Sequence, residues 1–301
     1  MNNLVHIGLP KSASTWLQQS AFPLLEPKAF HGPSSPLGSL LLTLLYENEY
    51  EPGALASAME RQRSHAGRRL VLSLEGLSFR GQVLPGRPRA SIEETAARLG
   101  AEVSKPDVLF IVRRQDRLVR SVYAQYVHQG GLLTFEEWRK QPSRAYSFEA
   151  ERYDHARTIE IYSRHAASMT VVPFELLATK PDVFLAQISA ALGQGGPTTS
   201  VDTGRAVNPS LSPGGLRALQ VWNRYLRKSP ANPRPLLPLP WPERHRKVVQ
   251  VAVDPLARRF TPKDAQDHDE WAAAFASEFA ASNRELQAVV DADLESLGYP
   301  I

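Results

Sequence analysis

The sequence contains no cysteine among its 301 residues. Disulfide bonds, thiol catalysis and cysteine-ligated metals are therefore excluded. None of the eight histidines shows the spacing of a metal site, so we expect no bound metal. Because disulfides belong to oxidising compartments, the absence of cysteine also fits a cytoplasmic protein, which is the location that we expect.

Long hydrophobic runs are also missing. The longest apolar segment, Leu37 to Tyr46, is about half as long as a bilayer span requires. Near the N-terminus, the apolar stretch Leu4–Gly8 runs directly into Pro10 and Lys11 and is too short for the core of a signal peptide. We therefore expect neither a membrane span nor a signal peptide.

The chain has little excess charge of either sign. Its formal net charge is +4, and the positive residues are spread along the chain instead of being gathered in a tail. This distribution favours a local anion pocket over a nucleic-acid surface. We therefore expect a small-molecule or glycan partner and no nucleic acid, while the sequence indicates no particular oligomeric state.

Four short apolar runs are typical of strands buried on both faces of a parallel sheet: Leu4–Gly8, Leu70–Leu74, Val108–Val112 and Met169–Phe174. Helical patterns lie between and after them, at Ser12–Leu25, Asp116–Gln129, Glu151–His165, Pro181–Leu192, Gly215–Arg227 and Glu270–Leu297. The alternation predicts an α/β fold with a doubly wound, mainly parallel sheet flanked by helices, and a helical C-terminal region. In such folds a ligand binds beyond the carboxyl ends of the strands.

We expect one domain over residues 1–301. Its α/β body covers about residues 1–228, and six prolines between Ser229 and Pro242 predict an extended connection without helix over 229–242. Residues 243–301 then form the C-terminal helical part. The connection is interpreted as a linker, and a lid that faces the substrate is the alternative.

The segment 4–17 reads LVHIGLPKSASTWL, a buried strand, a tight loop and the start of an amphipathic helix. Backbone N–H groups at a helix start and the helix dipole attract phosphate groups. Lys11 adds a mobile positive charge, and three hydroxyl groups add donors: Ser12, Ser14 and Thr15. We predict an anion-binding loop; the alternative is that Ser12 only caps the helix and Lys11 is solvated. Because Lys11 precedes the small residues, unlike the lysine of GxxxxGKS or GxxxxGKT, an NTPase P-loop is the weaker interpretation.

A second cationic pattern follows the strand Val108–Val112. This strand ends in Arg113 and Arg114, and Ser121 comes eight residues after Arg113 on the next predicted helix. A guanidinium at the carboxyl edge of a central strand suits a phosphate monoester, because it can form two charge-assisted hydrogen bonds. The alternative for Arg113 is an exposed ion pair at the surface.

The two patterns together resemble the PAPS-dependent sulfotransferases, of the bacterial, P-loop-like α/β type. PAPS is 3'-phosphoadenosine 5'-phosphosulfate, and PAP is its desulfated product. Residues 10–16, PKSASTW, resemble the family's PKSGTTW signature, with Ala13 in place of glycine. The segment from Arg113 to Ser121 resembles the 3'-phosphate motif RxPxDxxxS, with Gln115 and Arg117 in place of proline and aspartate. If the loop needs a positive φ at Ala13, alanine is strained there.

The resemblance implies a role for each matching residue. It assigns Lys11 to the bridging oxygen and the sulfonate, and Trp16 to the neighbourhood of the adenine, although core packing alone also explains a tryptophan there. The donor-binding residues that it implies are Pro10, Lys11, Ser12, Ala13, Ser14, Thr15, Trp16, Arg113, Ser121 and, in a later loop, Arg205. No metal is required, because lysine and arginine can carry the electrostatic work.

Glu75 is the first candidate for the base that takes the acceptor proton. It follows the strand Leu70–Leu74 at the ligand edge of the sheet, and a similar Ser-x-Glu element occurs in many bacterial sulfotransferases. The alternative is that Glu75 pairs with a structural arginine such as Arg80. His31 is the second candidate, because histidine is the base in the cytosolic branch of the family.

The predicted function is in-line transfer of the sulfuryl group from PAPS to an acceptor hydroxyl or amine, on a carbohydrate or another small molecule. One alternative is a P-loop nucleotide kinase, which would need a magnesium-binding acidic residue where Arg113 and Arg114 stand. The other is a non-catalytic protein that binds nucleotides or anionic glycans. Intact Lys11, Arg113 and Ser121 favour the enzyme.

Overall fold

The structure of the protein is a computed structural model, which describes residues 2–22, 30–66, 69–78, 87–140, 150–193, 211–226, 234, 249–260 and 269–301. The chain forms two compact units. Unit 1 comprises Met1–Gln115, Ala150–Arg205 and Glu278–Ile301, and unit 2 comprises Asp116–Glu149 and Ala206–Ser277. One domain over residues 1–301 remains a prediction, and the connection 229–242 lies outside the described residues except for Arg234.

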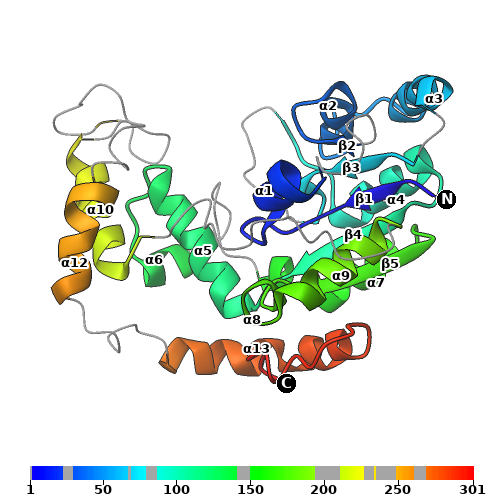
Figure 1. The fold of residues 1–301 in the computed structure, drawn as a ribbon. Helices are drawn as coiled ribbons and strands as arrows, with labels where there is room; N and C mark the ends of the chain where they lie inside the picture. The colour runs from blue at the N-terminus through cyan, green and yellow to red at the C-terminus, as the bar shows by residue number, and fades with distance from the viewer. Residues whose placement is uncertain are drawn as a thin grey trace. The chain divides into compact units, whose positions relative to one another are not determined.

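Unit 1 is built on a five-stranded parallel sheet with the order β2-β3-β1-β4-β5 (Figure 1). Its strands are β1 (Leu4–His6), β2 (Phe30–His31), β3 (Val71–Ser73), β4 (Asp107–Val112) and β5 (Ser168–Pro173). The four predicted strands and the α/β fold class are confirmed. Strand β2 was not predicted, because two half-buried residues leave no apolar run in the sequence.

The order of the strands locates the ligand edge of the sheet. From β1 the chain passes to the edge strand β2, returns to β3 beside β1, and then crosses to β4 on the other side of β1. Val5 in β1 pairs with Leu72 of β3 and with Val108 of β4. In parallel sheets of this kind, ligands bind at the carboxyl ends of the strands where the winding changes direction, which here are the ends of β3, β1 and β4.

Helices cover both faces of this sheet, as a doubly wound fold requires. Trp16 of α1 and Phe184 of α9 bring their rings to 6.2 Å, while α4 packs against α3 and α7. Right-handed crossovers place these two groups on opposite faces. The helical elements of unit 1 are α1 (Ser14–Trp16), η1 (Leu17–Ala21), α2 (Pro36–Thr43), α3 (Ala54–Ala66), η3 (Glu75–Leu77), α4 (Ile92–Val103), η4 (Ala150–Tyr153), α7 (His155–Ser163), α8 (Leu176–Thr179) and α9 (Pro181–Ala191).

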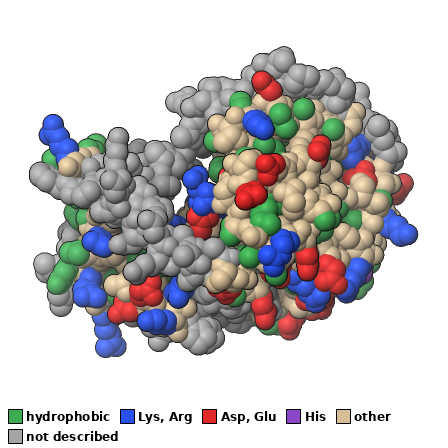
Figure 2. All heavy atoms as spheres, turned by 90° about the horizontal axis from the view of Figure 1, so that it is seen from below, with side chains coloured by type: hydrophobic (Ala, Val, Ile, Leu, Met, Phe, Trp, Pro, Cys, Tyr) green, Lys and Arg blue, Asp and Glu red, His purple; other side chains and the backbone are tan. Residues whose placement is uncertain are grey.

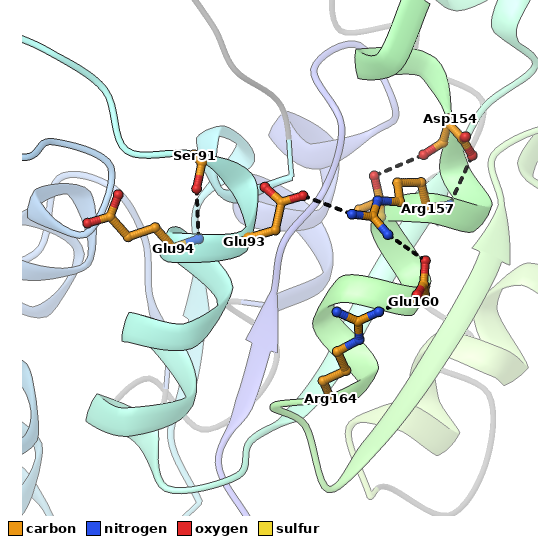
Figure 3. A network of polar contacts seen from close by, with 8 residues as sticks. Ser91, Glu93, Glu94, Asp154, Arg157, Glu160 and Arg164 are labelled. Carbon is orange, nitrogen blue, oxygen red and sulfur yellow. Dashed lines mark hydrogen bonds and ion pairs between the residues drawn. The ribbon is translucent and has the colours of Figure 1, made fainter.

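A polar network joins α4 to α7 (Figure 3). Ser91 caps α4 and Asp154 caps α7 through their side-chain oxygens. Arg157 of α7 contacts Glu93 of α4 at 3.1 Å and Glu160 of its own helix at 2.8 Å. Exposed ion pairs of this kind contribute at most about 1 kcal/mol each to stability. Each helix cap also contributes about 1 kcal/mol, so the caps stabilise the fold as much as the ion pairs do.

Unit 2 has its own core. It contains α5 (Gln115–His128, whose first residue belongs to unit 1), α6 (Phe135–Arg139), α10 (Pro213–Leu226), η5 (Val249–Val253) and α12 (Asp254–Phe260). Tyr123 and Trp138 are buried and their rings lie 5.5 Å apart. The side-chain amide of Asn223, also buried, donates to the carbonyl of Val127 at 2.7 Å. These contacts attach α6 and α10 to α5.

The last helix, α13 (Asp269–Gln287), ends earlier than the predicted limit of Leu297. The side chain of Gln287 donates to the carbonyl of Ala292 at 2.9 Å and accepts from the N–H of Leu294 at 2.8 Å. These bonds hold the following chain in turns, although Leu294 and Leu297 remain buried. The predicted helix was too long because buried apolar residues continue at helical spacing beyond its end.

Two other predicted helices start late. The first was expected from Ser12, but α1 begins at Ser14 because Lys11 and Ala13 have positive φ. The helix expected from Glu151 begins at His155, after the 3₁₀ turn η4, because Asp154 caps it.

Charges on the surface are mixed in sign. On the face that Figure 2 shows, positive and negative side chains lie interspersed rather than in separate fields, in keeping with a net charge of only +4. Over the described ranges of the chain, no helix has the length and apolar character needed to span a membrane.

A substitution at Glu102 of α4 tests the packing of α3 on α4. Its buried carboxylate accepts from the N–H groups of Gly53 and Ala56 at 2.6 and 2.9 Å and from the hydroxyl of Tyr50 at 3.1 Å. We expect Glu102→Ala to lower the free energy of unfolding by about 2 kcal/mol, because it leaves buried donors without an acceptor. Urea unfolding measures the loss. The control Glu60→Ala, at an exposed position of α3, should change stability by less than about 0.5 kcal/mol; an equal loss would contradict the role of Glu102.

Candidate functional site

The loop between β1 and α1 has an unusual backbone. Lys11 and Ala13 adopt φ angles of 63° and 60°, whereas Ser12 between them has a negative φ. Backbones that alternate in this way turn successive N–H groups into one concavity, which binds anions. The alternative that Ser12 caps the helix is wrong, because the N-cap residue is Ala13, which makes no side-chain cap. The predicted loop therefore has the backbone of an anion site, with the Lys11 side chain exposed beside it.

A buried histidine supports this loop from below. The imidazole of His6 in β1 is fully buried, and its Nδ1 lies 2.8 Å from the hydroxyl oxygen of Ser73 in β3, which also accepts from Gln18 at 2.9 Å. A Cβ atom at Gly8 would lie 2.3 Å from His6 Nε2 and 2.8 Å from Ser14 Oγ. Burial lowers the pKa of His6 to about 3, so the ring is neutral. Glycine is therefore required at position 8, where the loop rests on the ring.

Glu75 stands beside the same loop. It is the first residue of η3, directly after β3, and is half-buried. Burial raises the pKa of its carboxyl group, while the positive charge of Lys11 and a hydrogen bond from Ser14 oppose that rise. The carbonyl oxygen of Leu9, 3.2 Å from Ser14 Oγ, is a second acceptor for the same hydroxyl proton. The structure thus brings Glu75, Lys11 and Ser14 together. Arg80, its alternative partner, lies outside the described residues.

Arg113 joins the second motif to the first. It follows β4 directly, and its guanidinium donates a hydrogen bond to the backbone carbonyl of Lys11. The guanidinium carbon also lies 4.8 Å from the centre of the Phe174 ring, after β5, which is a cation–π distance. A planar group with five N–H donors is thereby held at the edge of the Lys11 loop.

Three other predicted donor-binding residues lie in α1 or in the loop before it. Trp16 is buried in its contact with Phe184, so packing explains it and a role near adenine remains a prediction. Thr15 is exposed in the first turn of α1 and Pro10 is half-buried beside Lys11. Ser121 lies on α5 in unit 2. Arg205 lies outside the described residues.

His31, the second candidate base, lies in the edge strand β2. Strand β3 separates it from β1, which carries the loop. Burial lowers the pKa of its imidazole. Glu75, by contrast, has direct interactions with both Ser14 and Lys11, so the geometry favours Glu75. In the part of the chain that the structure describes, no group of three or more His, Asp or Glu side chains could hold a metal ion.

Sequence reasoning missed His6 and the other polar residues that support the site, and it also missed the Phe174 ring. A histidine inside an otherwise apolar strand was the available signal for His6, because buried polar groups require a partner. Phe174 carried no signal, since an aromatic residue at a strand end is ordinary in a core.

No family model and no curated protein matches the sequence. Solved structures are similar to it. A sulfotransferase from Alicyclobacillus acidocaldarius has a TM-score of 0.48 and 17% identity, covering 74% of this chain and 93% of that chain. The sulfotransferase domain of the curacin biosynthetic pathway has a TM-score of 0.43 and 13% identity, covering 68% and 79%. A mouse sulfotransferase solved in complex with PAP has a TM-score of 0.42 and 12% identity, covering 98% and 88%.

All three proteins are sulfotransferases, the family that the two sequence motifs resemble. At such low identities and scores, none of these similarities assigns a function to this chain.

The backbone of the loop can be tested at Ala13. Its left-handed conformation disfavours any residue with a Cβ atom, so we expect Ala13→Gly to raise the free energy of unfolding by about 0.5–1 kcal/mol despite the greater freedom of unfolded glycine. In the control Ala101→Gly, at an exposed position inside α4, the same change should lower stability by about 0.5–1 kcal/mol. Urea unfolding compares the two, and a loss of stability in both variants would contradict the left-handed conformation at Ala13.

Proposed function

We propose that this protein is a sulfotransferase that moves the sulfuryl group of PAPS to a hydroxyl or amine of a carbohydrate or another small molecule. The observation that carries the proposal is the meeting of two cationic groups at one edge of the sheet: the Lys11 loop, with its alternating backbone, and Arg113, which bonds to the carbonyl of Lys11. A donor with phosphate at both its 3' and 5' positions needs two such anion sites close together.

In this proposal the Lys11 loop and Arg113 bind different parts of the donor. The N–H groups around Lys11–Ser14 and the hydroxyl groups of Ser12, Ser14 and Thr15 bind the 5'-phosphosulfate, as backbone nests and helix starts bind anions elsewhere. Arg113 binds the 3'-phosphate with paired, charge-assisted hydrogen bonds. Ser121 and Arg205 are the further ligands of this phosphate that the motif resemblance suggests.

The chemistry is an in-line displacement at sulfur. The acceptor oxygen or nitrogen forms a bond to sulfur while the bond from sulfur to the bridging oxygen breaks, and the electron pair stays on that oxygen as PAP leaves. Lys11 stabilises the charge that develops on the bridging oxygen. Glu75 takes the proton from the acceptor, because its carboxylate stands beside Lys11 and Ser14. His31 is the alternative base.

Removing the guanidinium of Arg113 tests the donor site. We expect Arg113→Ala to lower the affinity for PAP by about 10–100-fold. The affinity for adenosine 5'-phosphate (AMP) should change little, because AMP lacks the 3'-phosphate. Calorimetry with both nucleotides measures this. Arg164→Ala, an exposed ion-pair residue after α7, should leave both affinities unchanged.

Equal losses for PAP and AMP in Arg113→Ala would assign the arginine to the fold or to the 5' side. Tighter binding of ATP with magnesium than of PAP would support a nucleotide kinase. Firm PAP binding without consumption of PAPS, across a screen of carbohydrate and phenol acceptors, would support a non-catalytic nucleotide-binding protein.

The pH dependence of kcat distinguishes the role of Lys11 from that of Glu75. Glu75 acts as a base only when ionised, so kcat should fall as the pH drops through its pKa, which burial raises above the ordinary glutamate value. Glu75→Gln should lower kcat and abolish this acid limb with little change in PAP affinity. Lys11→Ala should lower kcat by about 10²–10³ and move the acid limb to higher pH, because the lysine holds the pKa of Glu75 down.

Steady-state turnover and PAP calorimetry across pH decide between these outcomes. An acid limb that persists in Glu75→Gln would transfer the base role to His31. Normal turnover at saturation in Lys11→Ala, with PAP binding lost, would make the lysine a docking group only.

A further inference from the structure

The peptide group between Arg113 and Arg114 is held from both sides. Its carbonyl, which belongs to Arg113, lies 2.7 Å from Nε2 of His155 at the start of α7. Its N–H, which belongs to Arg114, donates to Oε1 of Glu175 at 3.1 Å. A peptide group is planar and rigid, so two bonds in opposite directions fix its rotation about the strand axis.

Both side chains that bind this peptide group are buried. His155 is 1% exposed and Glu175 is 6% exposed. Burial lowers the pKa of His155 to about 4, so the imidazole is neutral. A carbonyl only accepts hydrogen bonds, so Nε2 of His155 carries the proton and donates it. The ring also packs edge-on against Phe110 of β4, with 6.1 Å between ring centres.

The C-terminal segment holds Glu175 in place. The hydroxyl of Tyr299, which is 2% exposed, donates to Oε2 of Glu175 at 2.8 Å, so each carboxylate oxygen has a donor. The segment passes so close to Arg114 that a Cβ at Gly298, where φ is 82°, would lie 2.5 Å from Arg114 Nη1. Asn283 of α13 donates to the carbonyl of Pro300 at 2.8 Å and anchors the segment.

These contacts determine where the Arg113 side chain leaves the backbone. Pairing with β5 fixes the chain on the N-terminal side of Arg113, and the clamped peptide fixes it on the C-terminal side. The direction of the Cα–Cβ bond is then set, and the guanidinium reaches the Lys11 carbonyl and the Phe174 ring. Binding groups need such support from the residues behind them to hold a ligand well.

We propose that His155, Glu175 and Tyr299 are positioning residues that aim Arg113 at the 3'-phosphate of the donor nucleotide. The proposal rests on the function proposed above. It gives the C-terminal segment a part in nucleotide recognition that acts through Arg113.

The test is the gain in affinity that the 3'-phosphate provides, measured as the ratio of the Kd of AMP to the Kd of PAP by calorimetry. Tyr299→Phe removes one hydroxyl and should lower this ratio about three- to tenfold, with the Kd of AMP little changed. In the Arg113→Ala background, Tyr299→Phe should change the ratio no further, because the two residues act through one contact.

The matched control is Tyr162→Phe. Tyr162 is also buried in unit 1 and donates its hydroxyl to a backbone carbonyl, that of Leu77, at 2.7 Å. Tyr162→Phe should lower the free energy of unfolding about as much as Tyr299→Phe does, without changing the ratio of the two Kd values. His155→Phe supplies a second variant from the other side of the peptide: it keeps an aromatic ring against Phe110, loses the donor to Arg113, and should lower the ratio as Tyr299→Phe does.

A wild-type protein that binds PAP no more tightly than AMP would overturn the proposed function and the positioning role with it. Clear discrimination in the wild type, retained in full by Tyr299→Phe and His155→Phe, would overturn only the positioning role. The positioning role also fails if Tyr299→Phe weakens AMP and PAP equally, or if its effect persists without Arg113.

Discussion

Lys11 and Arg113 meet because β1 and β4 run side by side in the same direction. Parallel neighbours deliver their carboxyl ends to one edge of a sheet. Here β4 continues directly into Arg113, and β1 leads into the loop that carries Lys11. The hydrogen bond from the Arg113 guanidinium to the Lys11 carbonyl joins the two ends. Glu75, from the end of β3 on the other side of β1, completes the group. Three strand ends that are distant in sequence thus lie together, and the pairing of β1 with both neighbours fixes this arrangement.

The loop at the centre of this site is strained, and its surroundings hold it in that state. A left-handed conformation costs about 1–2 kcal/mol for a residue other than glycine, and both Lys11 and Ala13 adopt it. Such conformations persist only where neighbouring contacts dictate them. Here Gly8 rests on the His6 ring, Ser14 bonds back to the loop, and Arg113 bonds to the strained residue itself. Because these protein contacts already give the backbone the shape that anion binding requires, they favour a preformed site.

Much of this arrangement could be predicted from the sequence, because its signals are local. Buried strands appear as apolar runs, and residues at their ends fall at one edge once the strands are parallel. Three predicted residues, Lys11, Glu75 and Arg113, are therefore found together. The support around them could not be predicted. Glu175 and Tyr299 are 124 residues apart, and nothing in either local pattern indicates the pairing. The early end of α13 was missed for the same reason, since Leu294 and Leu297 keep helical spacing while side-chain bonds from Gln287 hold turns.

Each edge of the sheet carries an arginine that is held by several contacts, and the contacts differ between the two edges. At the amino edge, Arg69 bonds to the Asp107 carboxylate at 2.7 Å and to the carbonyls of Asn2 and Ala191 at 2.7 and 2.9 Å. The carboxylate neutralises its charge, and its donors point to protein acceptors. At the carboxyl edge, Arg113 donates to a carbonyl and lies over an aromatic ring, while the two oxygens of Glu175 accept from Tyr299 and from the N–H of Arg114. The carbonyl and the ring orient the guanidinium at this edge, which is the support that the proposed binding of a phosphate requires.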